Sequence, residues 1–335
     1  RVSCCYAEGT LLGRRRALVS SSAAAAVAAA YPPLAAAAPA SSALLTLGTA
    51  APCIDENGER RLFKGEDICY EAYNQVSWAL QTGYRRIDTA RHYANEGEIG
   101  MAVRAATDSG VLGSRDEVSI TTKVWMDEMG ERETIAAVRD SLRQTGFAYL
   151  DTCLIHFPGG NGIVQSPKRN RERRLGSWRA LESLKSDGLI LEIGVSNFTS
   201  RHVRELQAEA RQSIEVAQIE IHPYFQNAEL ASELRAQGIR IEAQSPLAHG
   251  QLRLLEDPVL LKIAAAHAGA TPAAVVLRWL QLRGFTPVVY SGSRERLKEN
   301  FAAAQTLPEL SAEELALIDT LEKNARVGFD PNLIV

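Results

Sequence analysis

Short apolar runs alternate with longer amphipathic stretches along the chain from about residue 46 onward. The runs are rich in β-branched and other large apolar residues, which is typical of buried strands. They predict eight strands, at residues 44–48, 85–88, 118–123, 149–155, 191–196, 216–221, 240–243 and 287–290. Regular alternation of strand and helix favours successive βα units and therefore a parallel sheet.

The stretches between the strands carry helical faces and helix ends. In one of them the apolar side chains recur at helical spacing and form a single face: Cys69, Ala72, Tyr73, Val76 and Leu80. Thr271 followed by Pro272 predicts the capped start of a helix. Ser311 and Glu314 form a capping box, so a last helix follows the eighth strand.

Eight strands alternating with helices match a closed (β/α)8 TIM barrel better than an open, doubly wound sheet. We expect the barrel to form a single domain over residues 46–335. Neither G-x-G-x-x-G nor G-x-x-x-x-G-K occurs in the chain. The phosphate-binding signatures of the main open-sheet nucleotide folds are therefore absent.

Residues 1–45 differ from the rest of the chain, because they hold four Arg, one Glu and long alanine tracts but few large apolar side chains. We expect a disordered targeting leader there. Arg14–Arg16, the apolar run after them and the small residues 38–40 resemble a twin-arginine signal, and the stretch before them resembles plastid transit sequence. This predicts a plastid (chloroplast) location, with the thylakoid lumen as a second destination. The alternative is a plain tail on an exported or cytoplasmic protein. The chain does not begin with Met, so we expect residues before Arg1.

The composition is that of an ordinary globular protein, with 46% hydrophobic residues, 23% charged residues and a net charge of −3. Such a balance offers no basic field for nucleic acid. Five cysteines, at positions 4, 5, 53, 69 and 153, form neither a C-x-x-C pair nor a zinc-type spacing. No run of 18 strongly apolar residues follows the leader, so we expect no membrane span in the body.

Ionisable side chains stand at three consecutive strand ends: Asp88 and Tyr93 at the second, Lys123 at the third and His156 at the fourth. In such barrels the chemistry lies where the strands end. The phenol of Tyr93 has an ordinary pKa near 10, and a neighbouring Lys123 ammonium is expected to lower it. Asp88 would orient Lys123, and His156 would hydrogen-bond to the same substrate oxygen. This set suits a developing alkoxide, as carbonyl reduction requires.

The same four side chains are also compatible with structural roles and with different chemistry. Asp and Lys at strand ends often form barrel salt bridges, and a lone Tyr or His is often simply packed. A metal bound by His156 and Asp88 is disfavoured, because Lys123 in the same cluster is a repelling cation. Lys123 as a Schiff-base nucleophile would indicate a lyase or hydrolase that needs no nicotinamide.

Longer strings around these residues resemble the aldo-keto reductase family, especially its bacterial and plant reductases of sugar ketones and small aldehydes. The strings are Gly83–Ala90 with Tyr93, Asn95 and Glu96, Thr122–Trp125, Tyr149–Pro158, Gly194–Asn197, Gln218–Pro223, Ser245–Leu247, Leu255–Pro258 and Arg296–Asn300. The resemblance implies a monomeric NADP-dependent carbonyl reductase that passes hydride from nicotinamide C4 to a small-molecule aldehyde or ketone, with Tyr93 as the general acid.

The resemblance also implies a coenzyme site spread over several strand ends. Ser196, Asn197 and Gln218 would bind the nicotinamide carboxamide, and their hydroxyl and amide groups supply both donors and acceptors. The remaining expected coenzyme contacts are Gly48, Thr49, Gln244, Ser245, Leu247, Tyr290, Ser291, Arg296, Glu299 and Asn300. Trp125 and Phe157 match aromatic walls of the substrate pocket, although both also suit a plain core.

Two residues depart from the family pattern. Gln244 stands where the family normally has an aromatic side chain that stacks on the nicotinamide. Tyr290 stands where a Lys normally pairs with the 2′-phosphate, which removes a charge-assisted hydrogen bond worth roughly 1.5–3 kcal/mol. NADP(H) therefore remains the expected coenzyme, with NAD(H) as an alternative. The same departures would permit a second function, a nucleotide-binding barrel that acts as a redox sensor or regulatory subunit.

Overall fold

Eight parallel strands close into a barrel in the order β1 to β8, as the alternation predicts. The computed structural model describes residues 45–50, 70–159, 167–306 and 310–334. The strands are β1 (Thr46–Gly48), β2 (Arg86–Asp88), β3 (Ser119–Val124), β4 (Leu150–Ile155), β5 (Ile190–Ser196), β6 (Val216–Glu220), β7 (Arg240–Gln244) and β8 (Thr286–Tyr290). Each strand pairs with the next, and β1 also pairs with β8, which closes the sheet.

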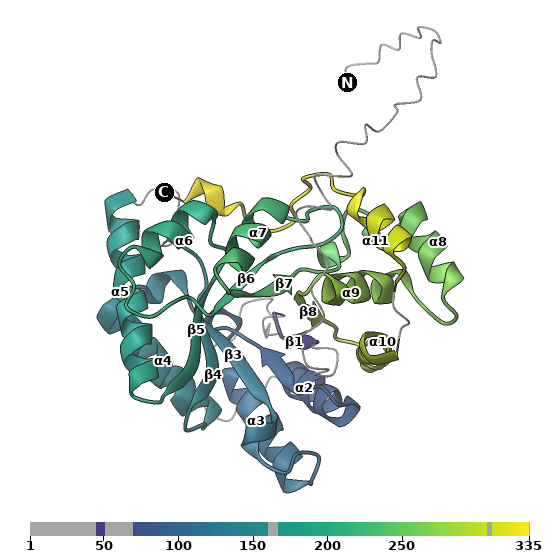
Figure 1. Cartoon of the computed structure of the whole chain (residues 1–335). Helices are drawn as coiled ribbons and strands as arrows, with labels where there is room; N and C mark the ends of the chain where they lie inside the picture. The colour runs from purple at the N-terminus through teal and green to yellow at the C-terminus, as the bar shows by residue number, and fades with distance from the viewer. Residues whose placement is uncertain (1–44, 51–69, 160–166, 307–309, 335) are drawn as a thin grey trace, which may run out of the picture.

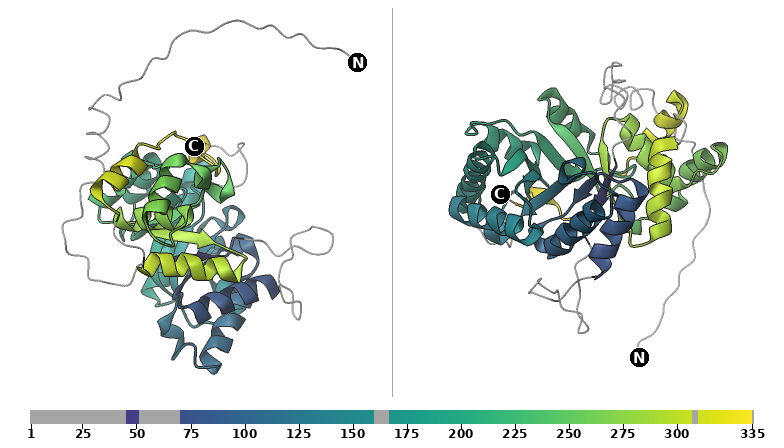
Figure 2. Two further views of the ribbon diagram at one scale, coloured as in Figure 1. Left: turned by 90° about the vertical axis from the view of Figure 1, so that its right-hand side faces the viewer. Right: turned by 90° about the horizontal axis from the view of Figure 1, so that it is seen from below.

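Helices surround the barrel (Figures 1 and 2). They are α2 (Tyr70–Thr82), α3 (Glu96–Asp108), α4 (Glu131–Thr145), α5 (Pro167–Ser186), α6 (Ser200–Gln207), α7 (Ala228–Ala236), α8 (Pro258–Ala266), α9 (Pro272–Leu282), α10 (Arg294–Thr306) and α11 (Ala312–Asp319). Short 3-10 turns are η1 (Arg91–Tyr93), η2 (Arg115–Glu117), η3 (Met126–Glu128), η4 (Ala248–Gly250), η5 (Leu254–Glu256) and η6 (Pro331–Leu333). Both α8 and α9 separate β7 from β8, whereas single helices connect most other strands.

The predicted helix ends are confirmed. The Thr271 side chain accepts a hydrogen bond from the amide of Ala274 and caps α9, with Pro272 at its first position. At α11 the hydroxyl of Ser311 accepts from the amide of Glu314, whose carboxylate accepts from the amide of Ser311. These bonds satisfy amide groups that the first turn of a helix leaves without a helical partner.

Close strand packing explains one glycine. A Cβ atom on Gly194 of β5 would lie 2.2 Å from the carbonyl oxygen of Val216 in β6. A side chain at this position would therefore force the two strands apart, since backbone atoms cannot yield as a flexible side chain does. The apolar faces of the helices cover the outside of the barrel; in α2, for example, Val76 and Leu80 are fully buried.

Several sequence expectations fall partly or wholly outside the described residues. The leader lies there except for Leu45, and so do the cysteines at 4, 5, 53 and 69, while Cys153 is a buried free thiol. Among the described residues, no helix is long and apolar enough to cross a membrane. The same part of the chain contains no group of three His, Cys, Asp or Glu residues placed to hold a metal ion.

Candidate active site

Asp88, Lys123 and His156 meet at the carboxyl end of the barrel, because β2, β3 and β4 run parallel and end at the same rim. Lys123 is fully buried. Its Nζ atom donates to Oδ1 of Asp88 at 2.6 Å and to the carbonyl oxygen of Thr89 at 2.9 Å. The charges of Asp88 and Tyr93 outweigh the effect of burial and raise the pKa of Lys123. Lys123 is therefore a fixed ammonium group, which disfavours it as a Schiff-base nucleophile.

Tyr93 lies in η1, next to Lys123 and His156. The Lys123 Nζ atom is 5.2 Å from the centre of the Tyr93 ring, and the His156 ring meets that ring edge-on at 5.8 Å. The structure thus brings the four predicted residues together. Burial raises the pKa of Tyr93 by more than the charge and hydrogen bond of Lys123 lower it. The prediction of a net fall in this pKa is wrong, since the sequence pattern does not reveal how strongly the phenol is desolvated.

His156 is buried just beyond β4, with 6% of its surface exposed. Burial lowers its pKa well below the ordinary value, and the nearby charges of Lys123 and His92 act in the same direction. The imidazole is therefore neutral at pH 7. A neutral imidazole carries one N–H donor and one acceptor nitrogen, so it can donate a hydrogen bond to a ligand oxygen.

The floor of the site contains a charged network that sequence reasoning missed. The side-chain amide of Gln218 donates to Asp88 at 2.7 Å and to Glu242 at 3.0 Å. Glu242 is fully buried and pairs with Arg240 at 2.6 Å and Arg86 at 3.4 Å. Both amide hydrogens of Gln218 are used, so its carbonyl oxygen is the group it can offer to a ligand. Arg240 and Glu242 are two positions apart in β7, and such residues point to the same face of a strand. This alternation was the sequence signal that could have revealed the network.

Amide side chains line the rim beside His156. Asn197 has a left-handed backbone and donates through Nδ2 to the His156 carbonyl at 3.0 Å and to the Ser196 hydroxyl at 3.1 Å. Gln244 donates to Oδ1 of Asn197 at 2.6 Å. This donor and acceptor set, with the carbonyl of Gln218, has the chemistry to hold the carboxamide of a nicotinamide coenzyme.

The remaining predicted coenzyme residues lie at the ends of β1, β7 and β8 and in α10. Thr49, after Gly48, donates to the carbonyl oxygen of Asp88 at 2.9 Å. Ser245 contacts Nε2 of His249 at 2.6 Å in the loop that contains Leu247, and both Ser245 and His249 have left-handed backbones. Backbone strain of this kind clusters at ligand sites.

Beyond β8 the side chains suit phosphate groups. Tyr290 is 51% exposed, and the charge of Arg296 acts on its phenol. Arg296 and Glu299 are exposed in the first turns of α10, whereas Ser291 and Asn300 are buried. A helix start and a guanidinium are favourable surroundings for an anion, so this region fits the adenosine phosphates of a dinucleotide.

Aromatic rings line the mouth around His156. Trp125 meets His156 edge-on at 5.0 Å and Phe157 edge-on at 5.8 Å, which places both predicted wall residues beside the reacting groups. His92 stacks on Trp125 with ring centres 3.6 Å apart, and Phe329 meets Phe157 edge-on at 5.9 Å. His92 and Phe329 were not predicted. His92 directly precedes Tyr93, which was a usable signal, whereas nothing in the sequence ties Phe329 to Phe157.

Ion pairs of Arg91 hold together the loops that carry Tyr93 and Trp125. Arg91 of η1 pairs with Glu96 at 3.2 Å, Glu128 at 3.0 Å and Asp140 at 2.7 Å. Glu128 also accepts a hydrogen bond from the backbone amide of Trp125. One guanidinium thus connects η1 to η3, α3 and α4, and fixes the approach of Tyr93 to the rim.

The basic run at residues 168–174 mainly serves structural contacts. Arg173 donates to the backbone carbonyls of Met126, Asp127 and Met129, and Arg174 pairs with Glu205 at 2.7 Å. These two guanidinium groups are therefore engaged in joining α5 to its neighbours.

Comparison with known proteins gives a consistent picture. The model of the aldo/keto reductase family matches residues 69–323. The glyoxal reductase of Bacillus subtilis (strain 168) is 40% identical over 262 residues, which cover 78% of this chain and 87% of that protein. The methylglyoxal reductase DkgB of Escherichia coli O157:H7 is 36% identical over 76% of this chain and 89% of that protein. The crystal structure of a Bombyx mori aldo-keto reductase in complex with NADP has a TM-score of 0.72, at 29% identity over 85% of this chain and 91% of that chain.

Proposed function

Because the chain belongs to the aldo/keto reductase family, we propose that it reduces a small aldehyde or ketone to the alcohol with NADPH, with Tyr93 as the general acid. The observation that carries this proposal is the buried Lys123–Asp88 pair beside the Tyr93 ring, with neutral His156 at its edge. This arrangement can stabilise an oxygen that gains negative charge, which is the electrostatic demand of carbonyl reduction.

Each polar group has a distinct part in the proposed reaction. A reduced nicotinamide, when bound, would supply the hydride for the carbonyl carbon. The Tyr93 hydroxyl transfers its proton to the carbonyl oxygen, and the Lys123 ammonium stabilises the phenolate that remains. Asp88 holds Lys123 in place at 2.6 Å. His156 donates a hydrogen bond to the same oxygen and orients the substrate.

We propose that the coenzyme lies across the ends of β5 to β8. Ser196, Asn197 and Gln218 would hold the carboxamide, and Gln244 would face the nicotinamide ring. The other expected contacts are Gly48, Thr49, Ser245, Leu247, Tyr290, Ser291, Arg296, Glu299 and Asn300. Structures of relatives with NADP and NADPH support NADPH. Because Tyr290 replaces a Lys, Arg296 and Arg294 would supply the positive charge for the 2′-phosphate.

The substrate side of the mouth favours compact carbonyl compounds with some apolar surface. Trp125 and Phe157 would exclude water from the reacting groups, which strengthens their electrostatic effect. Relatives named for the reduction of glyoxal and methylglyoxal support small aldehydes as a starting panel. We further propose that residues 46–335 act as a monomeric barrel, and that residues 1–45 direct it to the plastid.

A coenzyme titration followed by an aldehyde panel tests the function. Quenching of protein fluorescence gives the dissociation constants of NADPH and NADH, and loss of the reduced-nicotinamide absorbance reports turnover of glyoxal, methylglyoxal and a nitrobenzaldehyde. We expect tight NADPH binding and turnover of at least one aldehyde. Binding without any turnover would instead support the sensor function, and turnover without nicotinamide would support a Schiff-base mechanism.

A further inference from the structure

The chain after α11 runs past α7 and ends near α6 (Figure 1), and its Phe329 contacts Phe157 of the predicted substrate pocket. We name residues 321–334 the C-terminal strap. Hydrogen bonds hold both ends of the strap to the body of the barrel. The amides of Lys323 and Ala325 donate to the carbonyl of Tyr224, and the carbonyl of Ile334 contacts Nε2 of His202 at 3.0 Å.

The middle of the strap is held by one buried carboxylate. Glu220 ends β6 and is only 2% exposed. Its Oε1 accepts from the amide of Val327 at 2.7 Å, and its Oε2 accepts from the amide of Gly328 at 2.9 Å. His222 contacts Oε1 at 3.1 Å. Backbone amides that donate to a carboxylate form charge-assisted bonds, which are stronger than neutral ones.

Gly328 allows this close approach. A Cβ atom on that residue would lie 2.8 Å from Oε2 of Glu220. A side chain there would have to push Oε2 of Glu220 away from the amide of Gly328, so we expect it to weaken this hydrogen bond.

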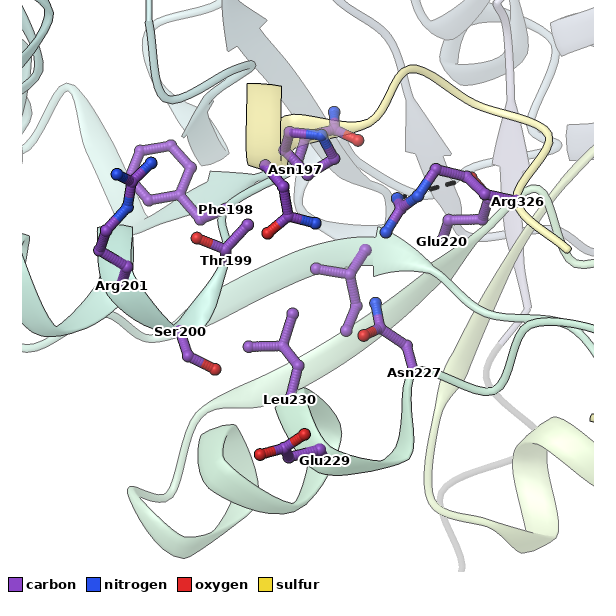
Figure 3. Close-up of a pocket in the computed structure, with 13 residues that line it drawn as sticks. Asn197, Phe198, Thr199, Ser200, Arg201, Glu220, Asn227, Glu229, Leu230 and Arg326 are labelled. Carbon is purple, nitrogen blue, oxygen red and sulfur yellow. Dashed lines mark ion pairs between the residues drawn. The ribbon is translucent and has the colours of Figure 1, made fainter. Parts of the chain in front are cut away.

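A cavity of about 410 Å³ lies against the same part of the strap (Figure 3). Asn197, directly after β5, and Arg201, in the first turn of α6, line one side of it, and Arg326 and Asn332 line it from the strap. Arg326 lies 3.9 Å from Glu220. The strap borders this cavity, so few side chains pack against it here. Its position therefore depends more strongly on the hydrogen bonds from Glu220.

Phe329 follows directly after the two residues that Glu220 holds. Its ring meets Phe157 edge-on at 5.9 Å, and Phe157 stacks on His156 with ring centres 5.3 Å apart. Phe329 itself is 47% exposed, so little else constrains it. The position of Phe329, on the outer side of the substrate mouth, therefore depends on the hydrogen bonds between Glu220 and the strap.

We propose that Glu220 is a positioning residue that holds Phe329 against Phe157 and thereby determines how well the enzyme binds carbonyl compounds with an aromatic or bulky apolar substituent. This rests on the proposed function. Substrates too small to reach Phe329 depend only on the inner groups, Tyr93, His156 and Trp125, so Glu220 does not affect them.

The variant Glu220→Gln tests this proposal, with Glu229→Gln as the matched control. Glu229 lines the same cavity but is exposed, and within the part of the chain that the structure describes it forms no hydrogen bond to the strap. In Glu220→Gln we expect the amides of Val327 and Gly328 to exchange hydrogen about tenfold faster, because an –NH2 group that cannot accept a hydrogen bond replaces one of the two carboxylate oxygens. We expect KM for a nitrobenzaldehyde to rise about fivefold, with KM for glyoxal and both kcat values unchanged.

If Glu220→Gln folds poorly, two further variants test the same role. Phe329→Ala should reproduce the KM change while leaving exchange at Val327 slow, and Gly328→Ala should reproduce both changes. The proposal is overturned if the two amides exchange faster in Glu220→Gln while the ratio of KM for the nitrobenzaldehyde to KM for glyoxal stays unchanged. It is also overturned if amide exchange in Glu220→Gln is unchanged. If the wild type reduces no aldehyde, the proposed function fails, and amide exchange still decides whether Glu220 holds the strap.

Discussion

The ammonium nitrogen of Lys123 lies 2.6 Å from Oδ1 of Asp88, and both side chains are buried at the open end of the barrel. Gln218 binds the second oxygen of Asp88, and Thr89 accepts another hydrogen bond from Lys123. The pair is therefore fixed before any ligand arrives. A preorganised charge of this kind needs no rearrangement when charge develops on a substrate.

Removal of one partner should destabilise the fold. In Lys123→Met the carboxylate of Asp88 stays buried without its cation, so we expect the free energy of unfolding to fall by about 3 kcal/mol. Urea denaturation measures this loss. Arg132→Met is the control, because Arg132 and Glu133 form an exposed pair, and its removal should cost less than about 0.5 kcal/mol. A double variant, Asp88→Asn with Lys123→Met, should lose less than the sum of its single variants.

Tyr93→Phe should abolish most of the activity without loss of coenzyme binding. Only the proton donor is removed, and general acid catalysis typically contributes about 10²–10⁴-fold to the rate. Stopped-flow single-turnover rates with an aldehyde measure the effect. Tyr149→Phe is the matched control, since the Tyr149 hydroxyl bonds to Asp116 near the surface. Full activity of Tyr93→Phe would contradict the mechanism.

The rate of reduction should not change with pH across the neutral range. Burial and the charge of Lys123 lower the pKa of His156 well below 6.5, so the imidazole is already neutral at pH 6 and loses no proton as the pH rises. Burial raises the pKa of Tyr93, so the phenol keeps its proton until the pH is strongly alkaline. We expect kcat/KM to stay flat from about pH 6 to about pH 9. An inflection near pH 6.5 that disappears in His156→Gln would show that His156 titrates.

Tyr290→Lys should restore discrimination for NADPH. An ammonium at this half-exposed position can pair with the 2′-phosphate, and a gain of roughly 1.4 kcal/mol corresponds to about tenfold tighter NADPH binding. NADH lacks that phosphate, so its affinity should stay the same. Fluorescence titrations of both coenzymes decide the point, with Tyr290→Gln as a neutral control. Equal gains for NADH and NADPH would mean that residue 290 does not contact the phosphate.

The barrel itself was predictable, because its strands are short apolar runs. The ends of such runs can be recognised from the local sequence, without knowledge of contacts between distant segments. The expected strand at 85–88 occupies Arg86–Asp88, and that at 240–243 extends by one residue to Gln244. Parallel strands in a closed sheet end at one rim, so Asp88, Lys123 and His156 could be placed together from their order alone.

Other features depend on contacts between distant segments. The link of Gln218 to Glu242 requires the register of β6 and β7, which becomes certain only when the sheet is closed. Phe329 reaches Phe157 through a segment without regular secondary structure. The sign of the Tyr93 pKa shift depends on how deeply the phenol is buried, and the pattern of residues around it gives no measure of that depth.

Closure of the barrel limits how far the chain can be shortened from its N-terminus. β1 is three residues long, yet it supplies hydrogen bonds to both β2 and β8; its Leu47 is buried, and so is Leu45 directly before it. Proteolysis or truncation beyond residue 45 would expose the unpaired edges of two strands, which are templates for aggregation. Any N-terminal truncation must therefore leave β1 intact.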